Sequence, residues 1–304
     1  MTRDEALPQQ ANRLARAPVL AALAGAVLIG LAPIGVRLSD VEPAATNLWR
    51  FLFALPVLAL WAARAPLPGR RDLAWLLGAG VLFGIELNLW AFALMQTTIA
   101  NATLLTNMTP VFAAAFAWVV FKERLGLGAL SGGAIALCGA LILALARARA
   151  GEGPSSVEAG WIGDGLALTA ALGYAGYLLI VRAVGDRVSV GAVMLWATLT
   201  GAALTYVLCL FTGEPLTPQT ARGWAILVGL GVVSHAAGQG LIAYAVGRLP
   251  IAVSTVLLWM QPIAAAALSW AIFGEALGGL ALFGAVLILA GIYIVQRMRA
   301  GAGR

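Results

Sequence analysis

Long apolar segments are the feature that most limits what this chain can fold into. Most of the sequence consists of apolar runs of roughly 20 residues, the length of helix that crosses the hydrocarbon core of a bilayer. The composition agrees, because 62% of the 304 residues are hydrophobic and 11% are charged, whereas a soluble domain carries about 25% charged residues. We therefore expect an all-α integral membrane protein with ten transmembrane helices, over residues 17–36, 43–63, 73–96, 98–120, 126–146, 160–182, 188–212, 222–247, 249–272 and 277–298.

One stretch of the sequence occurs twice. The segment MTPVFAAAFAWVVFKERLG at residues 108–126 returns as MQPIAAAALSWAIFGEALG at residues 260–278, an offset of 152 positions. Between residues 99 and 139, 19 of 41 positions match their partner at this offset without a gap. Chance similarity between two apolar helices would not align a proline, a tryptophan, a phenylalanine and a glutamate at one spacing. We interpret the two halves of the chain as copies of one unit.

The second unit is expected to lie upside down relative to the first. Each half contributes five helices, and an odd number of crossings makes the second half enter from the opposite side of the membrane. Lys and Arg are enriched on the cytoplasmic side. If the N-terminus is inside, fourteen of them fall on the inner side and four on the outer, so we expect both termini in the cytoplasm. Two inverted five-helix repeats around a central cavity are typical of transporters.

The chain is expected to divide into five parts. The run after the polar leader has no small-residue cleavage site, so we favour an uncleaved first span over a signal peptide. The basic residues are scattered at the ends of apolar runs, which indicates contact with lipid headgroups and not with nucleic acid. The parts are a cytoplasmic leader (1–16), the first repeat (17–146), a polar, glycine-rich linker (147–159), the second repeat (160–298) and a cytoplasmic tail (299–304).

With ten helices in two halves, the chain resembles the EamA-like branch of the drug/metabolite transporter superfamily. The segments that carry the resemblance are MTPVFAAAFAWVVFKERL and MQPIAAAALSWAIFGEAL, with the preceding TTIANATLL and LPIAVSTVLL. The resemblance covers nearly the whole chain, and within the branch the chain is most similar to the bacterial aromatic amino acid exporters. It implies a multi-pass protein of the inner membrane with a central cavity. The first, third, fourth, sixth, eighth and ninth helices would chiefly line that cavity.

Pro110 and Pro262 occupy equivalent places in the fourth and ninth spans. Proline removes a backbone donor and clashes with the preceding turn, so each helix is expected to bend there. Bent helices in corresponding places of two inverted halves point to the binding site and to gating. The alternative is a packing kink without a functional role.

Glu86 and His235 are polar residues near the middle of the third and eighth spans. A charge at the bilayer centre is costly, so such residues usually face a polar cavity. Glu86 is therefore expected to bind a substrate amino group or to take up a proton, with a protonated structural glutamate as the alternative. His235 is expected to line the same cavity at a similar depth, with a structural role as the alternative.

Other candidates for the cavity surround these two. Phe83 and Trp90 share a helix face with Glu86, and Gln239 shares one with His235. At the offset of 152, Phe83 corresponds to His235 and Asn107 to Trp259. Such unlike pairs can build an asymmetric site for an asymmetric ligand. Rings with polar tips suit an amphipathic ligand such as an aromatic amino acid. The complete set of cavity candidates is Phe83, Glu86, Trp90, Asn101, Asn107, Tyr174, Tyr177, His235, Gln239 and Trp259.

Arg50 lies within the outer third of the second span. Two interpretations are open. Its guanidinium either attracts substrate carboxylates or extends along the helix to the lipid headgroups, as long basic side chains do near helix ends.

The expected function is export of amino acids, aromatic and other neutral ones, by alternating access. A facilitator or uptake carrier for another metabolite, such as a nucleoside or sugar derivative, is the alternative within transport. A passive channel or an intramembrane enzyme would be a different class. With one histidine, no G-x-S-x-G and no paired intramembrane acids, we expect no catalysis, metal or cofactor. The two repeats predict that a monomer, in contact with only lipid and a small-molecule substrate, forms the pathway.

Overall fold

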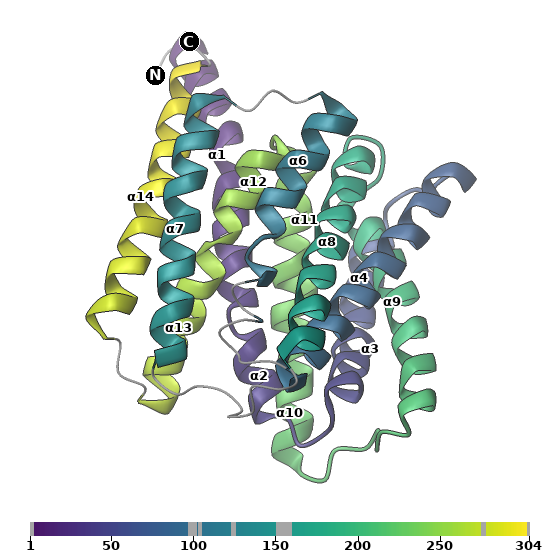
Figure 1. Ribbon diagram of the computed structural model, residues 1–304. Helices are drawn as coiled ribbons and strands as arrows, with labels where there is room; N and C mark the ends of the chain where they lie inside the picture. The colour runs from purple at the N-terminus through teal and green to yellow at the C-terminus, as the bar shows by residue number, and fades with distance from the viewer. Residues whose placement is uncertain are drawn as a thin grey trace.

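A computed structural model describes residues 3–96, 102, 105–122, 126–149, 160–274 and 278–302 of the chain. Every regular element in this described part is a helix (Figure 1). Eight helices are long and apolar enough to cross a membrane, and two shorter apolar helices cover residues 109–121 and 127–143. The expected all-α membrane fold with ten apolar segments is confirmed, and the chain is a multi-pass membrane protein.

The first half contains five apolar segments. The first of them is the joined pair α1 and α2, in which Pro33 lies in the first turn of α2. A proline also begins α3, where its missing N–H costs no helical hydrogen bond. The helices are α1 (Arg3–Ile29), α2 (Ala32–Leu38), α3 (Pro43–Ala62), α4 (Arg70–Gln96), α6 (Thr109–Phe121) and α7 (Leu127–Arg149).

The second half repeats this order. Its third segment is continuous from residue 221 to 246 but changes to a π-helix in the middle. Its fourth segment is broken at Trp259. The helices are α8 (Gly160–Val184), α9 (Val190–Thr212), α10 (Ala221–Gly229), η1 (the π-helix Leu230–Gln239), α11 (Gly240–Val246), α12 (Ile251–Leu258), α13 (Met260–Phe273) and α14 (Gly279–Ala302).

The fifth helix of each half, α7 and α14, packs against the other through glycines. A Cβ atom at Gly132 would lie 2.6 Å from the carbonyl oxygen of Gly291, and one at Gly139 would lie 2.6 Å from that of Gly284. Small residues let helices approach closely in a membrane. Residues 132 and 139 correspond to 284 and 291 at the offset of 152, so the contact joins equivalent helices crosswise. Because the pairing runs antiparallel (Figure 1), the two repeats are inverted.

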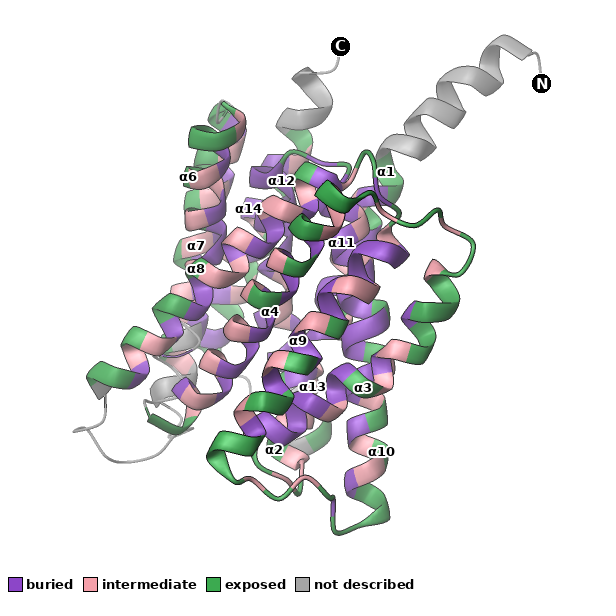
Figure 2. Cartoon of the chain, turned by 90° about the vertical axis from the view of Figure 1, so that its right-hand side faces the viewer, coloured by how far each residue is buried: buried purple, intermediate pink, exposed green. Residues whose placement is uncertain are grey.

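The outer faces of the helices are exposed, and the inner faces are buried (Figure 2). Leu60, Leu210 and Phe211 are among the large apolar side chains on the outside, which is the arrangement that lipid contact requires. In the interior, α4 packs against α8 and α9, while α3 packs against α9 and η1. These five elements surround the polar residues near the middle of the molecule.

Candidate functional site

Arg50 is the charged side chain at the centre of α3, and it is only 1% exposed. Its Nε atom has no hydrogen-bond partner. The helix η1 lies directly against this part of α3, because a Cβ at Gly231 would be 3.0 Å from the carbonyl oxygen of Arg50. Extension to the lipid headgroups, one of the two interpretations of this residue, is therefore not what the structure shows. The guanidinium is enclosed by protein.

Glu86 lies on α4, the neighbouring helix, and faces Gly173 of α8. A Cβ at Gly173 would touch the Glu86 side chain at 3.4 Å. The residue is partly exposed, and its Oε2 atom is buried without a hydrogen-bond partner. Arg50 and Glu86 are not joined by an ion pair with an N–O distance up to 4.0 Å, in contrast to Arg182 with Asp186 and Arg187 with Asp72.

Aromatic rings from four helices, α3, α4, α8 and η1, pack together beside Glu86. The centroid of Phe83 lies 4.6 Å from that of Tyr177 and 6.3 Å from that of Tyr174, and these rings are stacked. The Phe83 ring also contacts His235 at 5.4 Å, and Phe51 contacts His235 at 5.1 Å. We call these five residues the aromatic cluster. Tyr174 is its partly exposed member, whereas the other four are fully buried.

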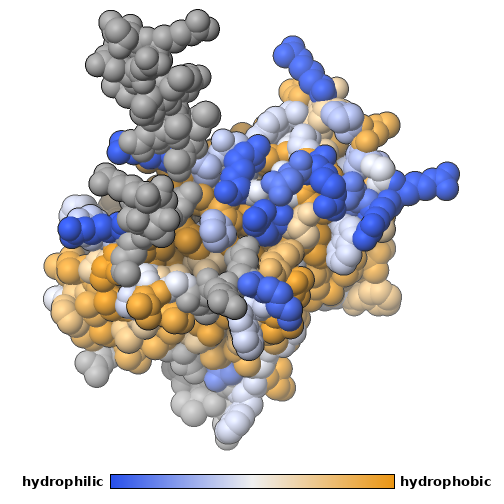
Figure 3. Space-filling model, turned by 90° about the horizontal axis from the view of Figure 1, so that it is seen from above, coloured by the Kyte–Doolittle hydropathy of each residue, from blue (hydrophilic) through white to orange (hydrophobic). Residues whose placement is uncertain are grey.

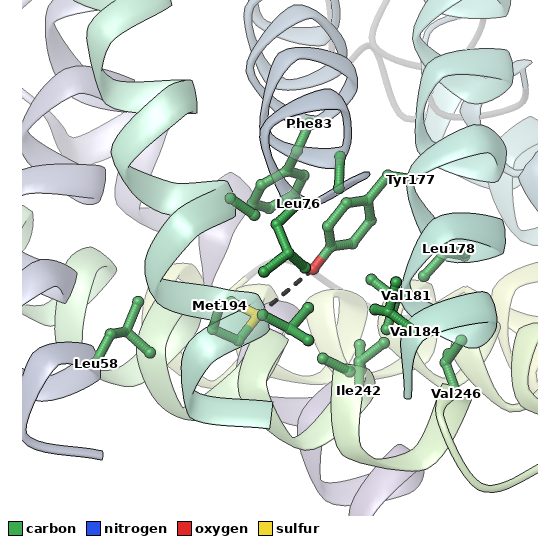
Figure 4. Close-up of a cluster of buried hydrophobic side chains, with 14 of the residues drawn as sticks. Leu58, Leu76, Phe83, Tyr177, Leu178, Val181, Val184, Met194, Ile242 and Val246 are labelled. Atoms are coloured by element: carbon green, nitrogen blue, oxygen red, sulfur yellow. Dashed lines mark hydrogen bonds between the residues drawn. The ribbon is translucent and has the colours of Figure 1, made fainter. Parts of the chain in front are cut away.

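Tyr177 connects the aromatic cluster to the hydrophobic core. Figure 4 shows its hydroxyl group directed toward Met194, among leucine and valine side chains. The hydroxyl donates a hydrogen bond to Met194 Sδ at 3.4 Å. In this conformation Tyr177 is a packed core residue, and Tyr174 is the tyrosine at the accessible edge.

Two polar side chains from the π-helix complete the centre. Nε2 of His235 shares a hydrogen bond with the Thr198 hydroxyl at 2.9 Å, while Nδ1 has no partner. Gln239, which is 4% exposed, accepts a hydrogen bond from the Tyr174 hydroxyl at 3.1 Å. A π-helix widens the turn and is frequent at functional sites. Its presence here places both side chains toward α8 and α9.

The segments that contain Pro110 and Pro262 are each interrupted shortly before the proline. Helix α6 begins at Thr109, and Trp259 separates α12 from α13. Pro110 cannot donate to the Thr106 carbonyl, and the Thr109 hydroxyl donates to it instead at 2.8 Å. The Trp259 indole donates to the Asn107 carbonyl at 3.1 Å, so the two interruptions are joined to each other.

Residues that correspond by the repeat therefore meet at the centre. His235 contacts Phe83, and Trp259 is bonded to Asn107; both pairs have the offset of 152. Trp259 is 3% exposed and does not face lipid. The amide nitrogen Nδ2 of Asn107 is buried without a partner.

Three of the predictions from the sequence, Trp90, Asn101 and the 147–159 linker, are not part of the centre that the structure describes. Trp90 is partly exposed and makes no contact with the rings of the aromatic cluster within the described part of the chain. Asn101 lies outside the described residues, and so does nearly all of the 147–159 linker. Among the residues that the structure describes, no group of three or more His, Cys, Asp or Glu side chains could hold a metal ion.

A second polar cluster was not predicted from the sequence. The Asn88 amide donates to the Thr205 hydroxyl at 2.7 Å, and the Asn47 amide donates to the Leu87 carbonyl at 3.1 Å. All three polar side chains are buried. Asparagine within an apolar span is itself a signal, because an unpaired amide in a membrane is costly. Here the amides bond α3, α4 and α9 to one another, at the two residues that follow Glu86.

Comparisons with known proteins agree with the fold. Residues 16–145 and 161–297 each match the EamA-like transporter family. A protein named "Probable terminal-alkyne amino-acid exporter" from Streptantibioticus cattleyicolor is 30% identical over 280 residues, which cover 89% of this chain and 90% of that protein. A solved structure described only as "Crystal structure of protein" has a TM-score of 0.78 with 22% identity, covering 92% of this chain and 96% of the other. The last likeness shows the fold alone.

Proposed function

The chain belongs to the EamA-like transporter family, which it matches in both halves, and from this premise we propose that it exports amino acids by alternating access. The substrates are aromatic and other neutral amino acids. The relative named as a probable exporter of an amino acid with a terminal alkyne supports the substrate class. No catalytic step and no cofactor belong to this proposal.

The observation that carries the proposal is the position of Glu86 beside the aromatic cluster. A carboxylate next to stacked rings offers one surface for an ammonium group and another for an apolar side chain. Tyr174, at the accessible edge, adds a hydroxyl that is hydrogen bonded to the buried amide of Gln239. Neutral amino acids match such a site, because each carries an ammonium group for Glu86 and an uncharged side chain for the aromatic rings.

The interrupted helices support alternating access. In inverted-repeat transporters, discontinuous helices meet at the substrate site and one repeat moves against the other. The Trp259 to Asn107 hydrogen bond joins the two interruptions across the centre. We propose that Pro110 and Pro262 keep these points open for rearrangement between inward-facing and outward-facing states. A single chain contains both repeats, and it would function as a monomer within the lipid bilayer.

Both termini are proposed to be cytoplasmic, in the inner membrane. Helix α1 begins and α14 ends at the same end of the molecule (Figure 1). Figure 3 views this end and has hydrophilic side chains gathered over an apolar body. The exposed residues of the loops that belong to this end include Arg64, Arg70, Arg71, Arg187 and Arg248. An excess of basic residues is typical of cytoplasmic loops.

Counterflow in proteoliposomes tests the function. Vesicles loaded with unlabelled L-phenylalanine should accumulate radiolabelled L-phenylalanine with saturable kinetics, and L-leucine should compete, whereas uridine and glucose should not. Exchange of uridine or glucose without any amino acid would overturn the substrate class. Flux that does not saturate would indicate a channel.

One matched pair of variants tests whether the substrate binds at Tyr174. Tyr174→Phe removes the hydroxyl that donates to Gln239, and it should raise the KM for phenylalanine severalfold. Tyr206→Phe removes a hydroxyl from a side chain that is 48% exposed on the outside of α9, and it should leave the KM unchanged. Equal effects of the two changes would argue against a site at Tyr174.

A further inference from the structure

We propose that Arg50 and Glu86 form a two-charge site for a zwitterion, in which Arg50 binds the α-carboxylate and Glu86 binds the α-ammonium group. The inference rests on the proposed amino acid export. It goes beyond that proposal by naming the two residues that bind the α-carboxylate and the α-ammonium group of the substrate. Because each residue binds one end, the site would select molecules that carry both charges.

The first observation is that both residues lie deep within the membrane spans. Among the described residues, they are the only charged ones more than five positions from either end of their span. Charged residues at such depths are costly and mark substrate or ion pathways. All other described charges lie near span ends, where water and headgroups solvate them.

The second observation is that the two charges do not satisfy each other. Arg50 Nε and Glu86 Oε2 are both buried without a hydrogen-bond partner, and the two side chains are not within ion-pair distance in the structure. The ring of Phe51, the residue after Arg50, lies 6.0 Å from the ring of Phe83, one turn before Glu86, so α3 and α4 carry the two charges at one level of the interior. A buried ion pair is stabilising only when it is close and its remaining polar atoms are hydrogen bonded. This pair meets neither condition by itself.

The third observation is that tight backbone contacts fix the two helices that carry Arg50 and Glu86. Arg50 lies on α3, whose backbone is pressed against η1 at Gly231, and the next residue, Phe51, lies 3.0 Å from the position of a Cβ at Gly201 in α9. Glu86 lies on α4, which is fixed against α9 by Gly80 and Gly84. Tight glycine contacts of this kind leave little freedom for α3 and α4 to move closer to each other, so that Arg50 and Glu86 could form an ion pair.

An α-amino acid supplies the missing partners for both charges. Its carboxylate accepts from the forked guanidinium donors, and its ammonium group donates to the carboxylate of Glu86. Both groups are attached to one carbon, so one ligand can reach both residues. The substrate side chain then extends toward Tyr174, the partly exposed member of the aromatic cluster. A phosphate would meet Glu86 as a like charge, which disfavours phosphorylated ligands.

The test uses three ligands that differ only at the charged ends. L-Phenylalanine has both charges, L-phenylalaninamide lacks the carboxylate, and N-acetyl-L-phenylalanine lacks the ammonium group. Their dissociation constants are measured from the ligand-dependent rise in Tm of the purified protein. The wild-type protein should bind each analogue at least about tenfold more weakly than phenylalanine, because each analogue leaves one charged residue unpaired.

Each variant should remove one preference and keep the other. In Arg50→Gln, phenylalanine and its amide should bind within about twofold of each other, while the N-acetyl compound remains disfavoured. In Glu86→Gln the reverse should hold. Arg222→Gln and Glu42→Gln remove exposed charges at span ends and should keep both preferences. If Arg50→Gln and Glu86→Gln weaken all three ligands by the same factor, the two residues are structural and the inference is wrong.

The conservative variants answer the same question if neutral ones do not fold. Glu86→Asp shortens the side chain and should weaken phenylalanine and the amide but not N-acetylphenylalanine, and Arg50→Lys should weaken phenylalanine and N-acetylphenylalanine but not the amide. The opposite pattern, or no selective change, would overturn the inference. Failure of the proposed function is distinguishable: in that case the wild-type protein exchanges no amino acid in counterflow, whereas failure of this inference leaves amino acid exchange intact and the preferences unaltered.

Discussion

His235 lies at the middle of the molecule with one of its two ring nitrogens hydrogen bonded. Nε2 is paired with Thr198 at 2.9 Å and Nδ1 has no partner. Thr198→Val keeps the shape of the side chain but leaves both nitrogens unpaired. A buried polar atom without a partner is costly, so we expect a loss of about 1 kcal/mol in the free energy of unfolding, read as a lower Tm of the purified protein.

Thr200→Val is the matched control for this change. Its hydroxyl donates to the Trp196 carbonyl of its own helix at 3.0 Å, and no second residue depends on it. The expected loss is no more than about 0.5 kcal/mol. If the two variants melt at the same temperature, the hydrogen bond to His235 does not stabilise the protein.

At the scale of single residues, the sequence indicated which side chains are unusual but not how they are packed. A polar residue in an apolar span is conspicuous by itself, which is why Glu86 and His235 were candidates. Arg50 left two interpretations open, since a basic residue in the outer third of a helix can reach the headgroups. Its burial depends on η1, a helix about 180 residues later in the chain, whose Gly231 lets it approach. Such a contact cannot be read from the neighbouring sequence.

At the scale of elements, local chemistry predicted more. The ten apolar segments follow from hydropathy, which is a property of each segment alone. The irregular backbone before Pro110 and Pro262 follows from the missing proline donor. The π-helix from 230 to 239 was not predicted, because its glycines at 231 and 238 are packed against α3 and α1. That packing, a tertiary property, accompanies the change in helix type.

Helix α13 offers a test of whether its interruption serves transport. Pro262→Ala restores a backbone donor opposite the Leu258 carbonyl, so α12 and α13 can join into one continuous helix. We expect the Tm to stay equal or to rise, because a helical hydrogen bond is gained. The rate of phenylalanine counterflow should fall severalfold, because a continuous helix is harder to rearrange.

Pro56 provides the control proline. It lies inside α3 and is exposed on the outer surface, so Pro56→Ala also adds a helical donor, but away from the centre. Its counterflow rate should be close to that of the wild-type protein. Loss of transport in both variants, or in neither, would contradict a special role for the interruption at Trp259.

At the scale of the whole molecule, the two inverted repeats share a scaffold but not a site. Equivalent glycines join α7 to α14 crosswise, and equivalent positions meet at the centre as unlike residues, with Phe83 against His235 and Asn107 against Trp259. Because the two repeats have the same scaffold, each can adopt the conformation of the other when the site switches from one side of the membrane to the other. An asymmetric centre can bind an asymmetric ligand in one orientation. The side chains that differ between the halves are therefore the place where substrate choice is proposed to reside.

Coupling to protons belongs to the same scale, because it links the two sides of the membrane. Glu86 is the carboxylate in the proposed site, and the other titratable side chains of this site and of the aromatic cluster are Arg50, Tyr174, Tyr177 and His235. One carboxylate can hold a proton or bind a substrate ammonium group, but not both. If the two compete at Glu86, a proton enters as an amino acid leaves, and the protein is an antiporter.

Efflux from proteoliposomes checks this prediction. Vesicles loaded with phenylalanine should release it faster when the external buffer is made acidic, and the ratio of rates with and without the gradient is measured at saturating substrate. In Glu86→Gln that ratio should fall to one, because glutamine cannot take up the proton, whereas Glu42→Gln, at the exposed start of α3, should keep the wild-type ratio. A wild-type ratio of one would mean facilitated transport without coupling. A Glu86→Gln protein that still responds to the gradient would place the proton elsewhere, and competition at this carboxylate would then not explain the direction of transport.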